Sequence, residues 1–379
     1  METLAVKIES IELRQISLPL VSTFTTSFGS QSERGCILVT VRAEGAAGYG
    51  ECVAAEGPWY SYETIGTAWH VLQDYLAPRL LGHDLDDPMT VWDLFAPVRG
   101  HNMAKAALEM ACWDLVAKAR GVSLRDLLGG ERDRVAVGVS VGIQSSPSAL
   151  VDTVGGYVAD GYARVKLKIA PGHDEEYVAA GRAAFPATLT QVDANSAYTL
   201  ADGPIFERMD GLDLLLIEQP LGPDDIVDHA ALQRRLRTPL CLDESIHSPD
   251  DARHALDLGS CRVINIKPGR VGGHRRSREI HDLCRARDIP VWCGGMLETN
   301  IGRAHNVALA SLPGFTLPGD ISASARYYAR DVAFPDFALN DDSTLSVPTG
   351  PGLGVEPDRE ALAAATVRSE VFAAASVAV

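Results

Sequence analysis

A regular spacing of charged residues at the ends of short apolar runs constrains the fold of this chain more than any other feature. Eight β-branched runs begin between residues 135 and 314, and most of them precede a turn and a helical segment. Five runs end in a charged residue, with steps of 25, 25, 25 and 24 positions, at Lys168, Asp193, Glu218, Asp243 and Lys267. A strand, a loop, a helix and a return loop need roughly that many residues, so the spacing predicts a parallel barrel whose strand ends lie at one height.

The boundaries of this barrel follow from changes in the sequence pattern. The eighth run, at 314–320, is followed by the Pro/Gly-rich "PGDIS" and no long helix, which predicts a modified TIM barrel, (β/α)7β, over residues 131–325. Residues 1–130 differ: "CILVTVRAEGAAGYGECV" predicts a hairpin, and "AKAALEMACWDLVAKARG" predicts a helix that ends at Gly121. This part of the chain is expected to form a separate α+β domain.

The second run, "ARVKLKI", carries two lysines in an otherwise strand-like segment. Side chains alternate across a strand, so Lys166 and Lys168 share one face while Val165 and Leu167 point to the other. From these residues alone, a half-exposed amphipathic strand is the simpler interpretation, because lysine is seldom buried. The barrel makes burial plausible, since the next strand ends in the carboxylate of Asp193.

Bulk composition excludes several classes of protein. The hydrophobic fraction of 46% is enough for a large core, and a net charge of −16 disfavours nucleic acid and anionic membranes as partners. The seven scattered cysteines contain no CxxC pair, which predicts neither a disulfide framework nor a zinc site and fits a reducing cytoplasm. The charged N-terminal segment and the absence of any long apolar run predict no signal peptide and no membrane span.

The carboxylates at three consecutive strand ends point to a metal. Asp193, Glu218 and Asp243 would crowd together, and like charges that close do not all ionise without a cation. Three oxygen ligands with no nearby His or Cys suit Mg²⁺, or alternatively Mn²⁺. The competing interpretation is that each acid caps the helix after its strand, which explains any one of them but not three in register.

The lysines at the second and sixth strand ends suggest acid–base chemistry. Lys168 and Lys267 would lie on opposite sides of the barrel mouth, on either side of the α-carbon of a bound carboxylate substrate. Proton removal there gives an enediolate, whose charge a divalent ion stabilises. The nearby cation and the neighbouring lysine both favour the neutral amine that a general base requires. Lys166 is that neighbour and is also placed to bind the substrate carboxylate.

The motifs "KLK", "DAN", "EQP", "DES", "KPGRVGG" and "CGGMLETNIGRAHNVALASLPGFTLPGDISAS" occur in an order that resembles the enolase superfamily, muconate-lactonizing subgroup. The resemblance is greatest to o-succinylbenzoate synthases of the N-acylamino acid racemase type and covers nearly the whole chain. It implies Mg²⁺ ligands at Asp193, Glu218 and Asp243, and acid–base lysines at Lys168 and Lys267. It also implies a homo-oligomer, a dimer or an octamer, and a capping domain that residues 326–379 return to complete.

Further residues are expected around the pocket by position or by this resemblance. The segment at 22–35 reads as a mobile loop that closes over the mouth, together with residues 54–61. Arg270 is expected near Lys267, where it would change the behaviour of that lysine without touching substrate; a surface arginine paired with an acid is the alternative. The candidate substrate contacts, each of which could instead be a cap or a turn, are Tyr60, Trp59, Ser140, Asn195, Met296, Glu298 and Asp320.

The resemblance implies dehydration of 2-succinyl-6-hydroxy-2,4-cyclohexadiene-1-carboxylate to o-succinylbenzoate, a step of menaquinone biosynthesis, and racemisation of N-acylamino acids such as N-succinylamino acids. Both reactions begin with the same proton abstraction. Dipeptide epimerase and muconate cycloisomerase are the alternatives within the superfamily, although "PGDIS" offers only Asp320 where epimerases have an Asp-x-Asp pair. A non-catalytic barrel is the alternative from another class, and the retained charge cluster disfavours it.

Overall fold

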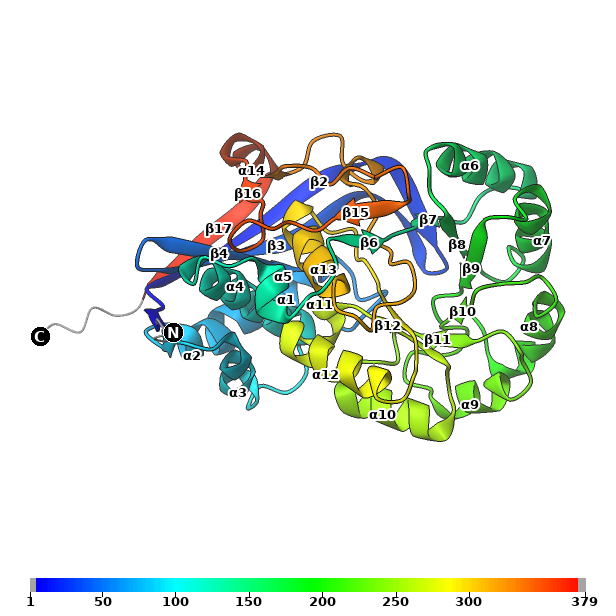
Figure 1. The fold of residues 1–379 in the computed structure, drawn as a ribbon, viewed down its shortest axis with the longest axis horizontal. Coiled ribbons are helices and arrows are strands. Elements are labelled where there is room, and N and C mark those ends of the chain that lie inside the picture. The colour runs from blue at the N-terminus through cyan, green and yellow to red at the C-terminus, as the bar shows by residue number, and fades with distance from the viewer. Residues whose placement is uncertain (1–4, 374–379) are drawn as a thin grey trace, which may run out of the picture.

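The computed structural model describes residues 5–373, and its largest sheet is the predicted barrel. Seven parallel strands pair in chain order along the sheet, each hydrogen-bonded to the next. Figure 1 shows this sheet as a curved array enclosed by helices. The strands are β7 (Val139–Val141), β8 (Arg164–Lys168), β9 (Leu189–Asp193), β10 (Ile217–Glu218), β11 (Leu240–Leu242), β12 (Val263–Ile266) and β13 (Val291–Cys293).

The eighth predicted strand differs from the expectation. Phe315 forms an isolated parallel bridge with Val291 of β13, and Gly319 forms another with Val137 just before β7. This segment therefore joins the two edges of the seven-stranded sheet without becoming a regular strand. Pro318 has no N–H to donate, and glycine weakens a strand, so "GFTLPGD" cannot sustain a continuous ladder.

Seven helices follow the seven strands, as the absence of a long helix after the eighth run predicted. Ser146, Ser248 and Thr299 each cap the next helix with a side-chain oxygen that accepts a backbone N–H. The helices are α6 (Pro147–Ala159), α7 (Glu175–Ala184), α8 (Gly203–Met209), α9 (Val227–Gln233), α10 (Pro249–Leu258), α12 (His274–Arg285) and α13 (Asn300–Ala310), with the short α11 (Pro268–Val271) after β12.

The N-terminal part of the chain forms the expected α+β unit. Its four-stranded antiparallel sheet has the order β17-β2-β3-β4, formed by β2 (Ser10–Thr26), β3 (Gly29–Ala43), β4 (Ala46–Cys52) and β17 (Thr366–Ala373). The predicted C-terminal return is thus visible as the pairing of β17 with β2, although the domain boundaries at residues 130 and 325 remain predictions. Helix α4 (Asn102–Ala119) is the predicted helix, and Gly121 follows it with φ +67°. A Cβ on Gly48 or Gly50 of β4 would clash with the backbone of α4, so glycine is required for this close packing.

Shorter elements complete both units. The remaining helices include α1 (Ile65–Val71), α2 (Ala77–Leu80), α3 (Val91–Phe95), α5 (Leu124–Leu128) and α14 (Arg359–Ala365). The two-stranded pairs are β1 (Val6–Lys7) with β5 (Asp84–Leu85), β6 (Arg134–Ala136) with β15 (Thr344–Ser346), and β14 (Ala333–Phe334) with β16 (Glu356–Pro357). Between residues 5 and 373, no helix combines the length and apolarity needed to cross a bilayer.

The expectation of an irregular loop at residues 22–35 was wrong. This segment is the far end of the β2–β3 hairpin, whose strands pair again from Phe24 and Gln31 to Thr26 and Gly29 after an irregularity in the register. Serine and threonine hide the alternation that would have predicted strands, because both faces of a projecting hairpin tip can carry polar side chains. The hairpin nevertheless reaches the barrel mouth, as Ser27 Oγ donates to the carbonyl of Asn195 at 3.1 Å.

Candidate active site

The charged strand ends meet at one end of the barrel. Lys168 and Asp193 are register partners, and Asp193 is in turn the partner of Glu218. Glu218 lies opposite Cys241, so Asp243 sits two residues further along the chain, directly after the end of β11. Side chains alternate along a strand with a period of two, so a shift of two residues keeps Asp243 on the same face of the sheet as Glu218. Both side chains therefore point into the barrel. The predicted convergence of the strand ends is therefore present.

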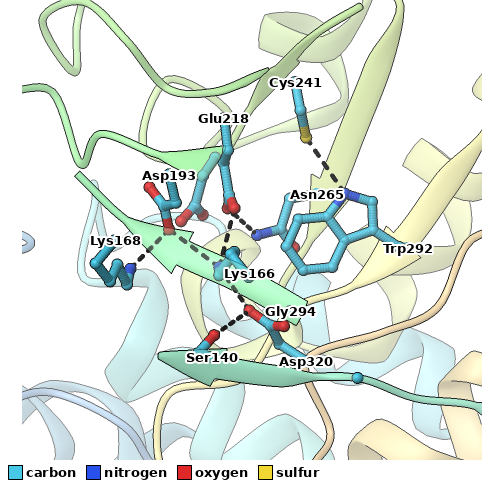
Figure 2. Close-up of polar contacts among 12 residues, drawn as sticks. Ser140, Lys166, Lys168, Asp193, Glu218, Cys241, Asn265, Trp292, Gly294 and Asp320 are labelled. Atoms are coloured by element: carbon cyan, nitrogen blue, oxygen red, sulfur yellow. Dashed lines mark hydrogen bonds and ion pairs between the residues drawn. The ribbon is translucent and has the colours of Figure 1, made fainter. Parts of the chain in front are cut away.

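Lys166 lies at the centre of this cluster and is only 2% exposed. Its ammonium group is 3.0 Å from Asp193 Oδ2 and 2.9 Å from Glu218 Oε2, and it also pairs with Asp320 (Figure 2). The ring of Trp292 lies 5.0 Å from Nζ. The half-exposed strand was therefore the wrong interpretation, because the carboxylates of neighbouring strands compensate the desolvation of this lysine.

The two candidate acid–base lysines each bind a different carboxylate. Lys168 Nζ lies 2.6 Å from Asp193 Oδ2 and donates to Asn195 Oδ1 at 2.6 Å. Lys267 Nζ lies 2.7 Å from Asp243 Oδ2, and it donates to Tyr60 Oη at 3.1 Å. These lysines come from β8 and from the end of β12, which are four strands apart in the sheet. They therefore approach the mouth from different sides.

Burial and charge shift the titration of these groups in opposite directions. Burial and the neighbouring Asp193 raise the pKa of Glu218 to about 8 despite the attraction of Lys166. Burial also acts to raise the pKa of Asp193, but Lys166 and Lys168 outweigh it and hold that pKa well below its usual range. Burial lowers and Asp243 raises the pKa of Lys267, and the carboxylate prevails. Glu218, which is deeply buried and close to Asp193, is thus the carboxylate whose charged form the cluster favours least.

The donor set fits a hard divalent cation. Asp193, Glu218 and Asp243 are fully buried on consecutive strands and offer carboxylate oxygens, the ligands that Mg²⁺ prefers. Burial and the neighbouring Asp193 both disfavour the charged form of Glu218, and a cation bound among these carboxylates would offset that penalty. Within residues 5–373, however, no three Asp, Glu, His or Cys side chains are oriented to bind one metal ion together. The carboxylates of the cluster instead face lysine and arginine side chains.

A cleft opens over this cluster and contains most of the predicted substrate contacts. Its volume of about 190 Å³ far exceeds the roughly 15 Å³ that one water requires. Both segments of the N-terminal unit that were expected at the mouth contribute to its wall, and Trp59 is 71% exposed at its rim. The predicted residues that line it are Trp59, Tyr60, Ser140, Lys166, Lys168, Asn195, Lys267, Met296 and Asp320.

Several of these residues also hold the charged cluster in place. Ser140 Oγ donates to Asp320 Oδ2 at 3.0 Å, and Tyr60 Oη donates to Asp243 Oδ1 at 2.9 Å. The Sδ atom of Met296 lies 3.6 Å from Lys267 Nζ. The backbone N–H of Asn195 donates to Asp193 Oδ1 at 3.0 Å. These contacts fix the carboxylates and the lysines relative to the cleft.

Glu298 and Arg270 lie near the site without lining the cleft. The Glu298 carboxylate accepts from the backbone of Met296 at 2.8 Å and from Asn306 Nδ2 at 2.9 Å, which is the turn role left open by the sequence. Arg270 is 2% exposed, and its guanidinium pairs with Asp243 Oδ1 while Lys267 binds Oδ2 of the same carboxylate. Arg270 is thus a buried partner of Asp243, and the alternative of a surface ion pair was wrong.

Sequence reasoning missed several residues of the cluster. Asn265 Nδ2 donates to Glu218 Oε1 at 2.8 Å, and Arg164 pairs with Asp320. Both were detectable, since Asn265 shares a face with Lys267 in "VINIK" and Arg164 shares a face with the lysines in "RVKLK". Trp292, whose ring faces Lys166, gave no signal because tryptophan in a strand is ordinary.

Comparison with known proteins places the chain in a class that this fold and site define. Residues 10–129 match the family "Mandelate racemase / muconate lactonizing enzyme, N-terminal domain", and residues 149–361 match "Enolase C-terminal domain-like". A solved enolase superfamily member from Listeria innocua superposes with a TM-score of 0.94 at 42% identity, covering 97% of this chain and 99% of that one. The chain belongs to the mandelate racemase and muconate lactonizing enzyme family of the enolase superfamily.

Relatives of known function identify a smaller family within this superfamily. An o-succinylbenzoate synthase from Geobacillus kaustophilus is 49% identical over 97% of this chain and 98% of the relative. An N-succinylamino acid racemase from Amycolatopsis is 52% identical over 94% of this chain and 96% of the relative. Within the superfamily, the chain therefore belongs to the family of o-succinylbenzoate synthases and N-succinylamino acid racemases. The predicted family, fold class and enzymatic nature are confirmed.

Proposed function

We propose that this enzyme removes the proton next to a carboxylate of its substrate and forms an enediolate. Its two reactions are the dehydration of 2-succinyl-6-hydroxy-2,4-cyclohexadiene-1-carboxylate to o-succinylbenzoate and the racemisation of N-succinylamino acids. The observation that carries the proposal is the placement of Lys168 and Lys267, which line one cleft from strands four apart and each bind a buried carboxylate. Two bases on different sides of one carbon are what racemisation requires.

The lysines have distinct roles in the two reactions. In dehydration, Lys168 removes the proton and returns it to the leaving hydroxyl, while the Lys267 ammonium group supports the enediolate electrostatically. In racemisation, one lysine takes the α-proton and the other delivers a proton to the opposite face. Lys166, held by Asp193, Glu218 and Asp320, cannot easily lose its proton and serves as a fixed positive charge toward the substrate carboxylate.

Asp193, Glu218 and Asp243 would hold the divalent cation that we propose as cofactor, Mg²⁺ or another hard ion such as Mn²⁺. When bound, such an ion supplies Lewis-acid stabilisation of negative charge on the substrate carboxylate. Tyr60 and Arg270 contribute by orienting Asp243, to which both are bonded.

Deuterium exchange tests the lysine roles. The wild type, incubated with Mg²⁺ in D₂O and either enantiomer of an N-succinylamino acid, should exchange the α-proton of both, as proton NMR reads directly. Lys168→Ala should stop exchange for one enantiomer and Lys267→Ala for the other. Retained exchange in the double variant would exclude lysine catalysis, and loss of exchange for both enantiomers in one single variant but for neither in the other would indicate a single base.

Dipeptide epimerisation is the weaker alternative in this site. Asp320, the only acidic residue in "PGDIS", is bound to Arg164, Lys166 and Ser140 and is therefore committed to the cluster. A dipeptide ammonium group would have to compete with these partners for the carboxylate.

We also propose that the enzyme acts in menaquinone biosynthesis, in the cytoplasm, as a homo-oligomer that binds no nucleic acid. The seven cysteines, all buried and none in a disulfide, support a reducing compartment. The net charge of −16 supports the absence of a nucleic-acid partner.

A further inference from the structure

The wall of the cleft that the N-terminal unit contributes carries one charged side chain among the described residues, Arg34 of β3. The other charged residues that line the cleft belong to the barrel: Lys166, Lys168, Lys267 and Asp320. The rest of the N-terminal wall consists largely of aromatic or small residues, and the aromatic ones are Phe24, Phe28, Trp59 and Tyr60. The guanidinium group of Arg34 therefore shares the cleft with Lys168 and Lys267.

Arg34 is 4% exposed, yet it makes no ion pair within residues 5–373. Its guanidinium donates one hydrogen bond, from Nη2 to the carbonyl of Val53, and its Nε is buried without a partner. The carboxylate of Glu51, which attracts it electrostatically, is already used by the backbone and hydroxyl of Thr299 and the backbone of Gly302. Burial of an uncompensated charge is costly, so this arrangement calls for an anion from outside the chain.

The other arginines with comparable burial show how unusual this is. Arg164 pairs with Asp320, and Arg270 pairs with Asp243. Arg303, which also lacks an ion pair, donates to two carbonyl oxygens, of Ser322 and Glu298, and does not line the cleft. Among the arginines of residues 5–373, only Arg34 combines deep burial, an incomplete set of partners and a position in the cleft wall.

We propose that Arg34 determines substrate specificity by binding the second, terminal carboxylate of a dicarboxylate substrate. This inference rests on the proposed function, in which the first carboxylate lies among Lys166 and the acidic cluster and the reacting carbon lies between Lys168 and Lys267. The succinyl group of either substrate ends in a carboxylate, and the guanidinium fork suits bidentate recognition of that group. The aromatic wall covers the apolar linker between the two charged ends.

A pair of substrates that differ only in the terminal charge tests this role. N-succinyl-phenylalanine ends in a carboxylate, whereas N-succinamoyl-phenylalanine ends in an isosteric carboxamide. With Mg²⁺-loaded wild type, kcat/KM for α-proton exchange should be at least about 30-fold higher for the succinyl compound, because an unpaired buried charge is left when the carboxylate is absent.

Arg34→Gln should reduce kcat/KM for the succinyl substrate at least about 30-fold and change the succinamoyl substrate less than about 3-fold. Arg34→Lys, which keeps the charge without the fork, should give an intermediate preference. Arg42→Gln is the matched control: it lies on the same strand, loses the same charge, and its guanidinium binds Glu12 outside the cleft. Its preference should equal that of the wild type.

Thermal unfolding separates this role from a structural one. Because no carboxylate of the protein is left unpaired, the Tm of Arg34→Gln without substrate should stay within about 3 °C of the wild type. Equal loss for both substrates, with a lowered Tm, would make Arg34 a structural link to Val53 and overturn the inference. Failure of the wild type to exchange either compound would instead reject the proposed function. If the wild type does not distinguish the two substrates, the second carboxylate is bound elsewhere.

Discussion

Two regions of the molecule bury acidic side chains completely, and they satisfy them in different ways. In the barrel mouth, Asp193, Glu218 and Asp243 each bind a lysine ammonium group. In the N-terminal unit, the buried glutamates accept mainly from backbone N–H groups at the starts of helices. A buried acid is therefore not by itself a sign of catalysis, and neither is a single ion pair, since Asp114 of α4 binds Lys118 away from the cleft. Several acids and lysines gathered below one cleft distinguish the chemical site from the structural ones.

The three buried glutamates among the described residues of the N-terminal unit show this second pattern. Glu63 accepts from the backbone of Met103 at 2.9 Å and of Ala104 at 3.1 Å, at the start of α4. Glu109 accepts from His274 at 2.8 Å and Arg275 at 2.9 Å, at the start of α12 in the barrel. Glu51 accepts from the backbone of Thr299 at the start of α13. Glu109 and Glu51 therefore connect the N-terminal unit to barrel helices. Carboxylates at helix N-termini satisfy free N–H groups and favour the helix dipole.

The largest expected effect comes from neutralising the three carboxylates at the barrel mouth. Asp193→Asn, Glu218→Gln and Asp243→Asn should each lower turnover at least about 1000-fold, since each removes a ligand of the proposed cation. Isothermal titration with Mg²⁺ should show lost or greatly weakened binding. Normal Mg²⁺ affinity in all three variants would remove the metal site from this account.

The stability of these variants depends on the partners of each carboxylate. Asp193 and Asp243 are paired with lysines, so neutralising either leaves a buried cation without its partner and should destabilise the protein. Glu218 also binds Lys166, but that lysine keeps Asp193 and Asp320, so Glu218→Gln should lower the Tm least of the three.

Removal of a glutamate that caps a helix should lower stability and leave kcat nearly unchanged. Glu109→Ala leaves two backbone N–H groups of α12 and the indole N–H of Trp113 without an acceptor, and should cost about 3 kcal/mol of unfolding free energy. Glu109→Gln, which retains an acceptor oxygen, should cost less. Urea denaturation measures both, and kcat of the folded fraction should change little. A large loss of kcat with unchanged stability would abolish the distinction between the two regions.

The pH dependence of stability provides a subtler comparison. Burial raises the pKa of Glu63 from 4.5 to about 7, against the lowering effect of the N–H groups of Met103 and Ala104. Between these values the folded state keeps a proton that the unfolded state has released, so this glutamate's contribution to stability is complete below pH 4.5 and is lost as pH rises to 7.

Urea unfolding of wild type and Glu63→Gln at pH 5 and pH 7.5 isolates this contribution. The wild type should lose about 2 kcal/mol more than the variant across the interval. The comparison with the variant is needed because burial lowers the pKa of His305 to about 4, which makes stability rise with pH in part of the same range. Both proteins contain His305, so its effect cancels. Identical pH dependence in the two proteins would mean that Glu63 is ionised in the folded state throughout.

The smallest effect is expected at Arg270, which shares Asp243 with Lys267. Arg270→Gln should reduce kcat/KM for N-succinylamino acid racemisation at least tenfold, about 1.4 kcal/mol, and reduce dehydration less. Racemisation needs Lys267 to carry a proton, whereas dehydration needs only its charge. Both reactions should be measured on one preparation; parallel losses, or none in either, would leave Arg270 a purely structural partner of Asp243.

The barrel site could be predicted from the sequence because its residues follow a regular period. Each βα unit returns the chain to the mouth after nearly the same number of residues, so Lys168, Asp193 and Glu218 become register partners by repetition alone. The lysines of "KLK" share a face because of the period of two along a strand. These are local and periodic rules, which a single sequence expresses.

The tertiary structure alone decided which charges meet and which stay unpaired. The hairpin tip at residues 22–35 carries no clear alternation, and its approach to the cleft depends on long-range pairing between β2 and β3. Glu109 meets α12 across 165 positions of sequence, and Arg34 lines the cleft without a carboxylate because of how two units pack. Electrostatic partnership depends on distance in space and on burial, neither of which is periodic along the chain. For that reason the sequence determined the charged strand ends of this site, whereas the arginine without an ion pair on the wall opposite them was settled only by packing.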